Sequence, residues 1–337
     1  MTIPRTRWGV LGASKFAINK CVPGIQGSAL CDVSAIASRD LDKAEDAADK
    51  LDIASSYGSY EELLADPTVD VIYIPLPNHL HVPWAIAAAK AGKHVLCEKP
   101  LAMTVEEVQR LIAARDAAGV VVGEAFMVRT HPQWLRARDL VASGRIGELR
   151  AATGFFSYTN VDPLNIRNRA DVGGGAIWDI GCYPVTTARL VFGTEPVRVA
   201  AAIVRDPEFG TDRLSSFILE FPQGHAIFTC STQLVPYQRM QFMGTKGRIE
   251  MEIPFNSPPD RPARLLVDDG GELFGSGIST ETFDIGDQYT WQADAFARAV
   301  LGEGPVPVPL EDSLKQVAVL TAIFKAAESG RWEPVQG

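Results

Sequence analysis

Two short segments carry side chains that could exchange protons with a substrate. One contains Lys99, which stands between a glutamate and a proline. The other is a run of three glycines, Gly173–Gly175, followed by Asp179 and Tyr183. Asp179 and Tyr183 are four residues apart and share one face of a helix. Tyrosine titrates near pH ~10 and needs a cation such as Lys99 to act near neutral pH. The alternatives are a surface Glu–Lys pair, a helix-capping Asp179 and a half-buried Tyr183.

A turn near the N-terminus has the residues that a dinucleotide site requires. Gly12 follows the apolar run Trp8–Leu11 and allows a tight turn. Ser14 stands where a second glycine is usual, and Ala17 lets a helix pack closely on the strand. Small residues here let the backbone approach a pyrophosphate at a helix N-terminus. A purely structural glycine turn is the alternative.

The end of the second apolar run bears on the choice of cofactor. Ser38 and Arg39 follow Val33–Ala37, where NAD-selective enzymes usually place an acid for the ribose 2′-hydroxyl. A small hydroxyl and a guanidinium instead suit a 2′-phosphate. We therefore expect NADP, with NAD as the alternative. A solvated Arg39 beside a helix-capping Asp40 also fits the sequence.

These residues fall at the ends of alternating strand and helix patterns. The predicted strands are Trp8–Leu11, Val33–Ala37, Val69–Ile74, His94–Glu98 and Val120–Gly123. The predicted helices are Leu41–Leu51, Tyr60–Ala65, an alanine-rich segment from about Pro83 to Gly92, and a segment from the capping box Thr104/Glu107 to Gly119. This alternation predicts a doubly wound parallel sheet, which binds ligands at the carboxyl ends of its strands.

The pattern changes after His131, where strand follows strand. The predicted strands are Leu149–Tyr158, Val197–Arg205, Leu214–Phe221, His225–Leu234, Met240–Gly244, Arg248–Ile253 and Ala263–Val267. The predicted helices are Pro132–Ser143, Ala176–Val191, Tyr289–Leu301 and Leu310–Ser329. We predict an α/β Rossmann domain over residues 1–128. An α+β domain with an open, largely antiparallel sheet, for substrate binding and oligomerisation, should follow over residues 129–337.

The second sheet carries apolar residues that alternate along two strands. They are Phe217, Leu219 and Phe221, then Phe228 and Cys230. If these side chains lay on the open face, that face would expose more apolar surface than water tolerates. We therefore expect a second subunit to cover it in a two-fold homodimer, which could pair further into a homotetramer.

Composition excludes several classes of partner. The 337-residue chain has 41 acidic and 32 basic residues, a net charge of −9, which disfavours nucleic acid and anionic membrane surfaces. Its five cysteines form no C-x-x-C pair, and no His, Cys or Asp cluster has metal-ligand spacing, so we expect no metal. The first seven residues lack the apolar stretch of a signal peptide, and no run approaches a membrane span. These features predict a cytoplasmic protein.

Four segments in order resemble the Gfo/Idh/MocA family (glucose–fructose oxidoreductase, inositol dehydrogenase and rhizopine catabolism). They are Trp8–Ala13, Ile74–His81, Gly92–Ala102 and Gly173–Pro184. The resemblance covers essentially the whole chain. Many members have histidine where this chain has Tyr183. Tyrosine marks a branch resembling glucose–fructose oxidoreductase, NADP-dependent xylose dehydrogenase and dimeric dihydrodiol dehydrogenase.

The resemblance implies roles for individual residues. Tyr183 would be the acid–base group, assisted by Lys99, and Asp179 would position the substrate hydroxyl or the lysine. Arg167 would face cofactor and substrate, unless it lies in a solvated loop. His81 should line the nicotinamide cleft, unless it only caps a helix. The substrate residues are Lys99, Arg167, Asp179 and Tyr183. The expected cofactor residues are Gly12, Ala13, Ser14, Lys15, Phe16, Ser38, Arg39, Tyr60, Leu76, Pro77, Asn78, His81, Glu98, Lys99, Met127 and Arg167.

The predicted activity is NADP-dependent hydride transfer at a carbon of a sugar or polyol, with oxidation at C1 of an aldose favoured. Because Lys99 and Tyr183 come from different predicted domains, we expect the active site in the cleft between them. One alternative is a trans-dihydrodiol dehydrogenase or a ketosugar reductase of the same branch. Another is a dinucleotide-binding sensor without turnover.

Overall fold

The computed structural model describes residues 5–336, which divide into two compact units. Unit 1 comprises the chain up to Thr130 together with Asp287–Leu314, and unit 2 comprises His131–Gly286 together with the chain from Lys315. The first division lies two residues beyond the domain boundary predicted from the sequence. The return of Asp287–Leu314 to unit 1 was not predicted from the sequence. Residues 1–4 of the segment inspected for a signal peptide lie outside the described residues.

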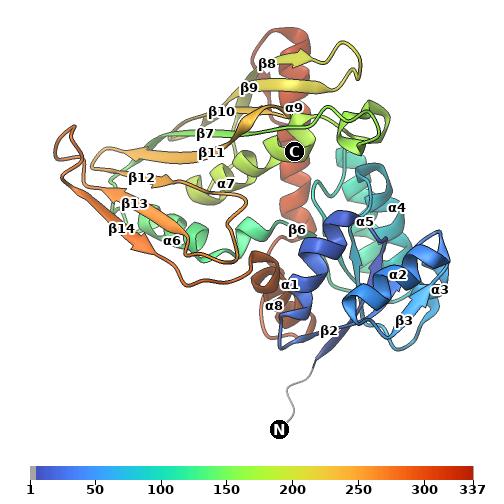
Figure 1. Cartoon of the computed structure of the whole chain (residues 1–337). Helices are drawn as coiled ribbons and strands as arrows, with labels where there is room; N and C mark the ends of the chain where they lie inside the picture. Colours follow the sequence, from blue (N-terminus) through green and yellow to red (C-terminus); the bar gives the residue numbers. More distant parts are fainter. Residues whose placement is uncertain (1–4, 337) are drawn as a thin grey trace. The chain divides into compact units, whose positions relative to one another are not determined.

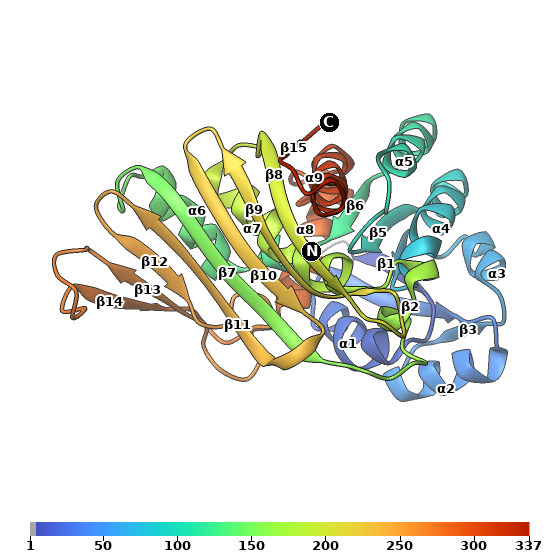
Figure 2. The ribbon, with the colours of Figure 1, turned by 90° about the horizontal axis from the view of Figure 1, so that it is seen from above.

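Unit 1 contains a six-stranded parallel sheet in the order β3-β2-β1-β4-β5-β6. The strands are β1 (Thr6–Leu11), β2 (Cys31–Ala37), β3 (Ser55–Tyr57), β4 (Val71–Ile74), β5 (His94–Glu98) and β6 (Val122–Ala125). The order reverses between β1 and β4, so this is the doubly wound arrangement expected from the sequence. Figures 1 and 2 show the sheet at the blue end of the chain.

In the described part of unit 1, five α-helices lie between these strands in the chain, and a sixth, α8, comes from the returning segment. They are α1 (Val22–Gln26), α2 (Leu41–Leu51), α3 (Tyr60–Ala65), α4 (Asn78–Lys90), α5 (Val105–Ala118) and α8 (Gln288–Val300). The helix α8 packs beside α1, where Thr290 Oγ1 donates to the Gly24 carbonyl at 2.6 Å. Figure 1 shows the two helices side by side. The segment Asp287–Leu314 therefore adds a helix beside α1 in unit 1.

Local signals set both ends of α5. Thr104 Oγ1 accepts the Glu107 N–H at 3.2 Å, and α5 ends at Gly119, whose φ is +66°. Both features match the predicted capping box and glycine stop. The predicted start of α4 was wrong, because Pro77 occupies its N-cap position and Pro83 lies inside the helix. Proline is common near the start of a helix, and here the proline that marks the start is Pro77, not Pro83.

Unit 2 contains a nine-stranded sheet in the order β14-β13-β12-β11-β7-β10-β9-β8-β15. The strands are β7 (Leu149–Thr159), β8 (Arg198–Arg205), β9 (Asp212–Phe221), β10 (Gly224–Ser231), β11 (Gln233–Gly244), β12 (Arg248–Met251), β13 (Arg264–Asp268), β14 (Ile278–Thr282) and β15 (Glu333–Pro334). Of the pairings described in this nine-stranded sheet, only β7–β10 is parallel, so the largely antiparallel prediction is confirmed. The sequence reading missed β14 and β15.

The helices α6 (Pro132–Ala142) and α7 (Cys182–Phe192) lie on one face of this sheet (Figures 1 and 2). A long helix, α9 (Leu310–Ser329), has the bounds predicted from its sequence and continues from unit 1 into unit 2. Among the described residues, no helix is long and apolar enough to cross a membrane.

The apolar residues assigned to the open face in fact point inward. Phe217, Leu219, Phe221, Phe228 and Cys230 are all at most 3% exposed. Phe221 stacks on Phe192 of α7, with the ring centroids 4.1 Å apart. The alternation was predicted correctly, but a period of two cannot tell which face is covered by helices. The argument for a dimer that used these residues is therefore wrong.

Candidate active site

The predicted cofactor segments of unit 1 all follow the carboxyl ends of strands in one sheet. Gly12 follows β1, Ser38 follows β2, Leu76 follows β4, Lys99 follows β5, and Met127 lies just beyond β6. Because the strands are parallel, these ends share one edge of the sheet. A doubly wound sheet binds its ligand at this edge, where the strand order reverses.

Gly12 forms the tight turn at that edge. Its φ is +112°, and its N–H donates to the Ala37 carbonyl at 2.8 Å. A Cβ at this position would lie 2.9 Å from Leu76 Cδ2 and 3.8 Å from the Tyr60 hydroxyl. Only glycine adopts this backbone without strain and leaves this space open. The turn therefore has the form that accepts a pyrophosphate.

The residues after Gly12 form a short wide helical turn. The hydroxyl of Ser14 accepts the Ala17 N–H at 3.1 Å, and Ala17–Cys21 is π-helical. Lys15 is exposed, and the ring of Phe16 meets Tyr289 of α8 edge-on at 6.0 Å. Single π-helical turns occur often at functional sites. Ala13 and Phe16 are both half-buried beside this turn.

The end of β2 presents the group expected to contact a 2′-phosphate. Arg39 is exposed, and it interacts with the hydroxyl of Tyr60. Burial raises the pKa of Tyr60, and the Arg39 charge acts in the opposite direction. Asp40 occupies the N-cap position of α2 without a capping hydrogen bond. Instead it pairs with Lys43 at 2.8 Å, an interaction that lowers the pKa of Asp40.

His81 lies inside the unit and does not face an open edge. Its side chain is 1% exposed, with Nδ1 2.8 Å from the Pro100 carbonyl and Nε2 2.7 Å from the Leu76 carbonyl. Burial lowers the pKa of His81 to about 4. Pro77 and Asn78 begin the helix that carries this histidine. The ring thus joins two chain segments within unit 1.

Glu98 is also turned into the unit. It is 7% exposed, and the Tyr73 hydroxyl donates to its Oε1 at 2.7 Å. The Lys99 N–H donates to Oε2 at 3.3 Å. Burial raises the pKa of Tyr73, so the phenol stays protonated and donates. The buried Glu98 carboxylate therefore holds the backbone N–H of Lys99 in place.

In unit 2 the glycine run brings a loop and a helix start close together. Gly175 has a φ of +116°, and its N–H donates to the Arg167 carbonyl at 2.8 Å. A Cβ on Gly174 would lie 2.6 Å from that same oxygen. A Cβ on Gly175 would overlap the carboxylate of Asp212. Asp212 accepts the Ile177 N–H at 2.7 Å and so fixes the helix start.

The helix that follows is not regular throughout. Ile177–Gly181 is π-helical, and the α-helix α7 begins at Cys182. The prediction of one regular helix from Ala176 was therefore incomplete. The wide turn contains Asp179 and ends two residues before Tyr183.

Asp179 is held by two donors on the same oxygen. The Tyr158 hydroxyl donates to Oδ2 at 2.6 Å, and Arg167 Nε donates to it at 2.9 Å. The Asp179 charge raises the pKa of Arg167, and burial raises the pKa of Tyr158. The guanidinium of Arg167 therefore stays charged beside the carboxylate of Asp179. This group has the chemistry to bind the hydroxyls of a polar substrate.

Tyr183 lies in an aromatic environment at the start of α7. It is 5% exposed, with ring centroids 5.8 Å from Phe156 and 5.6 Å from Phe255. Apolar neighbours favour the neutral phenol, so ionisation there requires a nearby positive charge. Tyr183 is among the groups that interact electrostatically with Arg167.

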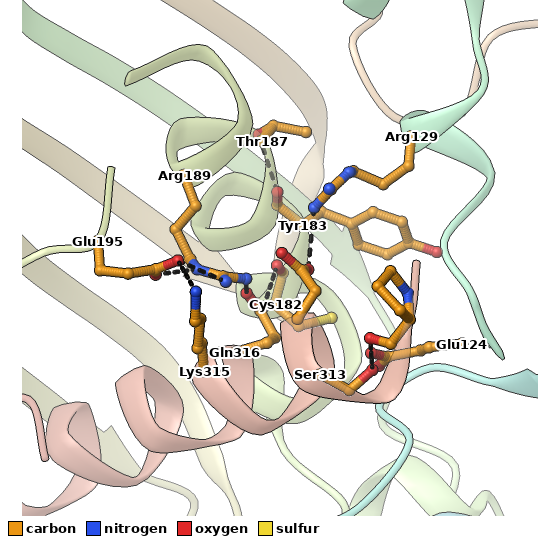
Figure 3. A network of polar contacts seen from close by, with 12 residues as sticks. Glu124, Arg129, Cys182, Tyr183, Thr187, Arg189, Glu195, Ser313, Lys315 and Gln316 are labelled. Carbon is orange, nitrogen blue, oxygen red and sulfur yellow. Dashed lines mark hydrogen bonds and ion pairs between the residues drawn. The ribbon is translucent and has the colours of Figure 1, made fainter. Parts of the chain in front are cut away.

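The helix that carries Tyr183 is fixed along its length within unit 2. Gln316 Nε2 donates to the Cys182 carbonyl at 2.8 Å, and its Oε1 accepts from Arg189 at 3.1 Å. Arg189 also pairs with Glu195 at 2.6 Å through a side chain only 2% exposed (Figure 3). The main chain of α7 therefore has little freedom to rotate.

Sequence reasoning missed Tyr158, Tyr73 and Asp212. Tyr158 and Tyr73 were assigned only to strands, and nothing in the pattern indicated that their hydroxyls bind carboxylates. Among the described residues, no group of three or more His, Cys, Asp or Glu side chains could hold a metal ion.

Comparison with known proteins gives the family. Residues 6–126 match the family described as "Oxidoreductase family, NAD-binding Rossmann fold", and residues 134–250 match the Gfo/Idh/MocA C-terminal domain. An uncharacterised oxidoreductase of Rhizobium meliloti is 49% identical over 98% of this chain and 99% of its own. The D-xylose 1-dehydrogenase (NADP(+)) 2 of Haloferax volcanii is 41% identical over 96% of this chain and 98% of its own.

A solved structure is similar over the same extent. The 3-ketoreductase KijD10 from Actinomadura kijaniata, in complex with NADP and TDP-benzene, superposes with a TM-score of 0.87. It is 31% identical over 96% of this chain and 98% of that chain. The fold and site define an oxidoreductase with a Rossmann domain. The chain belongs to the Gfo/Idh/MocA family, which confirms the resemblance seen in the sequence.

The glycine run makes a prediction about stability. Gly175→Ala should lower the free energy of unfolding by about 3 kcal/mol or more, through backbone strain and displacement of Asp212. Gly193→Ala is the matched control, because Gly193 also has a positive φ (+67°) but no atom within 4 Å of its added Cβ. It should cost only about 1–2 kcal/mol. Urea denaturation measures both, and equal losses would exclude the proposed overlap.

Asp212 makes a prediction about pH. Burial raises the pKa of Asp212 to about 6, above its value of ~3.9 in an unfolded chain. The folded state therefore holds the proton more tightly, and this stabilisation is present below pH ~4 and lost as pH rises through 6. The loss is on the order of 3 kcal/mol. Asp212→Asn removes it, so the variant should gain stability relative to wild type between pH 4 and 7. Parallel curves of unfolding free energy would contradict this.

Proposed function

We propose that this chain is an NADP-dependent oxidoreductase that moves a hydride between the nicotinamide and a carbon of a sugar or polyol, with C1 of an aldose the first choice. Family membership supports the reaction class. The similarity to an NADP-dependent D-xylose dehydrogenase over 96% of the chain supports the sugar. The observation that carries the assignment of the base is that both ring nitrogens of His81 lie against backbone carbonyls.

The residues of unit 1 fit the cofactor. The tight turn at Gly12, where no side chain covers the backbone, would approach the pyrophosphate, and the exposed Arg39 would pair with the 2′-phosphate. NADP held there supplies the hydride acceptor for alcohol oxidation. The solved KijD10 complex, which contains NADP, supports this choice.

The other residues of the proposed site transfer a proton and orient the substrate. Tyr183 takes the proton from the substrate hydroxyl on its Oη, since its ionised form is the base. Lys99 donates to the substrate oxygen and stabilises the phenolate, which lowers the pKa of the tyrosine. Arg167 and Asp179 hold further hydroxyls of the substrate. The proposal requires Lys99 and Tyr183, which belong to different units, to act on one substrate.

The rival base is His81, and its surroundings argue against it. Both ring nitrogens are within hydrogen-bond distance of backbone carbonyls, and the side chain is 1% exposed. A general base must reach the proton that it removes. We therefore assign the base to Tyr183, which interacts electrostatically with the charged Arg167.

Three other functions are testable. A ketosugar reductase would use the same residues in the opposite direction, as the similarity to KijD10 suggests, and a trans-dihydrodiol dehydrogenase would differ only in its substrate pocket. A dinucleotide-binding sensor would bind NADP without turnover. A panel of aldoses, ketosugars and diols, followed by NADPH absorbance, separates these functions. NADP binding without turnover on any of them would favour the sensor.

The mechanism makes a prediction about Tyr183. Tyr183→Phe should reduce kcat by roughly 10²–10⁴-fold, the usual contribution of a general base, while NADP affinity stays nearly unchanged. Lys99→Met should be at least as damaging. Tyr158→Phe is the control, because its hydroxyl binds Asp179 and its loss should act mainly on KM. Steady-state kinetics with D-xylose decides, and more than half of wild-type kcat in Tyr183→Phe would contradict the assignment.

The cofactor assignment makes a second prediction. Arg39→Ala should weaken NADP binding by roughly 10- to 100-fold, since it removes charge-assisted bonds worth about 1.5–3 kcal/mol, and should leave NAD binding unchanged. Lys43→Ala is the control, because that cation already pairs with Asp40. Fluorescence titration of both cofactors measures the ratio. An unchanged ratio would make Arg39 a surface residue.

We further propose that the outward face of the unit 2 sheet forms a homodimer interface. On the part formed by β8, β9 and β10 this face carries Val204, Ile218 and Ile227, with Ile227 50% exposed. The neighbouring part on β11–β13 is charged instead, with Arg248 and Asp268 paired at 2.9 Å. The apolar part is therefore the part that a second subunit would cover.

This proposal predicts the effect of a charge on the apolar part. Ile227→Asp should convert the dimer to a monomer, because it buries an unpaired charge at the interface. Thr280→Asp lies in the same cross-strand row at its far, charged end and should leave the dimer intact. Light scattering at low micromolar concentration measures both. A wild-type protein that is monomeric under these conditions would exclude the interface.

A further inference from the structure

The backbone beyond Lys99 is held from two sides by buried side chains. The Pro100 carbonyl lies 2.8 Å from Nδ1 of His81, and the Leu101 N–H donates to Oε1 of Glu124 at 2.9 Å. Leu101 is fully buried, His81 is 1% exposed and Glu124 is 3% exposed. Both contacts are made to one peptide group, Pro100–Leu101, which is thus fixed on its two sides by side chains from other elements and not by strand pairing.

Glu124 is itself fixed at its second oxygen. The hydroxyl of Ser313, a fully buried residue at the start of α9, donates to Oε2 at 2.6 Å. Glu124 belongs to β6, next to β5 in the sheet, with its Cα opposite Cys97. A buried carboxylate is costly unless donors satisfy it. The Leu101 N–H donates a hydrogen bond to Oε1 and the Ser313 hydroxyl donates one to Oε2. The carboxylate therefore cannot rotate without breaking one of these bonds.

His81 acts on the opposite side of the segment. Its ring lies between the Pro100 and Leu76 carbonyls, and it is carried by α4. The side chain of Leu76 also packs close to Gly12, since its Cδ2 would lie 2.9 Å from a Cβ at that position. A neutral ring has one N–H and donates to one of these carbonyls. The imidazole ring therefore sets the distance between the Lys99 segment and the turn that follows β4.

We propose that Glu124, with Ser313 behind it and His81 opposite, is a positioning residue that sets where the Lys99 ammonium lies. This inference rests on the proposed function, in which Lys99 is catalytic. The half-buried side chain of Lys99 starts from a backbone that these residues hold on both sides. Loss of one support lets that backbone shift, and a displacement of about 1 Å in a catalytic group can cost roughly 100-fold in rate.

The first experiment separates positioning from general stability. Ser313→Ala removes the donor to Glu124. Ser28→Ala is the matched control, because Ser28 is a buried serine of the same unit that donates to a carboxylate, Asp294, away from the Lys99 segment. Both variants should lower Tm to a similar extent. Only Ser313→Ala should lower kcat, by roughly 10-fold, with NADP affinity unchanged.

Two substitutions at Glu124 test the same point by rescue. Glu124→Gln keeps an oxygen that can accept the Leu101 N–H and should retain kcat within about 3-fold of wild type. Glu124→Leu removes the acceptor and should lose at least as much as Ser313→Ala. If Ser28→Ala lowers kcat as much as Ser313→Ala, or if Glu124→Gln is as damaging as Glu124→Leu, the proposal is wrong.

The second experiment asks whether the effect passes through Lys99. Ser313→Ala is combined with Lys99→Met, and single-turnover rates with D-xylose and NADP are measured at high enzyme concentration. If Ser313 acts through Lys99, its effect should shrink to less than about 2-fold in the Lys99→Met background. An undiminished effect would overturn the positioning role. Full activity of Lys99→Met alone would instead overturn the proposed function.

Discussion

A buried carboxylate that accepts a backbone N–H fixes the start of a chemically active segment in each unit. In unit 1, Glu124 accepts the Leu101 N–H two residues beyond Lys99. In unit 2, Asp212 accepts the Ile177 N–H two residues before Asp179. A buried charge is stable only where donors surround it, so each carboxylate requires one backbone arrangement and disfavours others. The positions of the reactive side chains depend on these contacts.

The sequence carried enough information to place the cofactor edge. Glycine at position 12 and lysine at position 99 each follow an apolar run, and parallel strands bring such ends to one edge of the sheet. The capping residue Thr104 and the glycine stop at Gly119 fixed the bounds of α5 for local reasons. Signals of this kind act within a few residues and do not depend on the rest of the fold. They were predicted correctly for that reason.

Other features depend on contacts between distant segments, and the sequence did not reveal them. The alternation around Phe228 was visible, but whether helices or solvent cover that face is decided by chain packing. The return of Asp287–Leu314 to unit 1 and the bond from Tyr158 to Asp179 are equally long-range. Two signals could have been used. Glu124 is an ionisable residue in a parallel strand that otherwise contains no polar side chain, and Ser313 is a polar residue on the buried face of α9.

In the proposed reaction, hydride passes directly between a sugar carbon and the nicotinamide while Tyr183 takes the hydroxyl proton. The most direct test follows the hydrogen itself. The enzyme is given NADP and D-xylose carrying deuterium at C1, and the reduced cofactor is examined by NMR. The account predicts deuterium at C4 of the nicotinamide ring. Reduced cofactor that carries no deuterium, or no reduction at all in a protein that binds NADP, would contradict it.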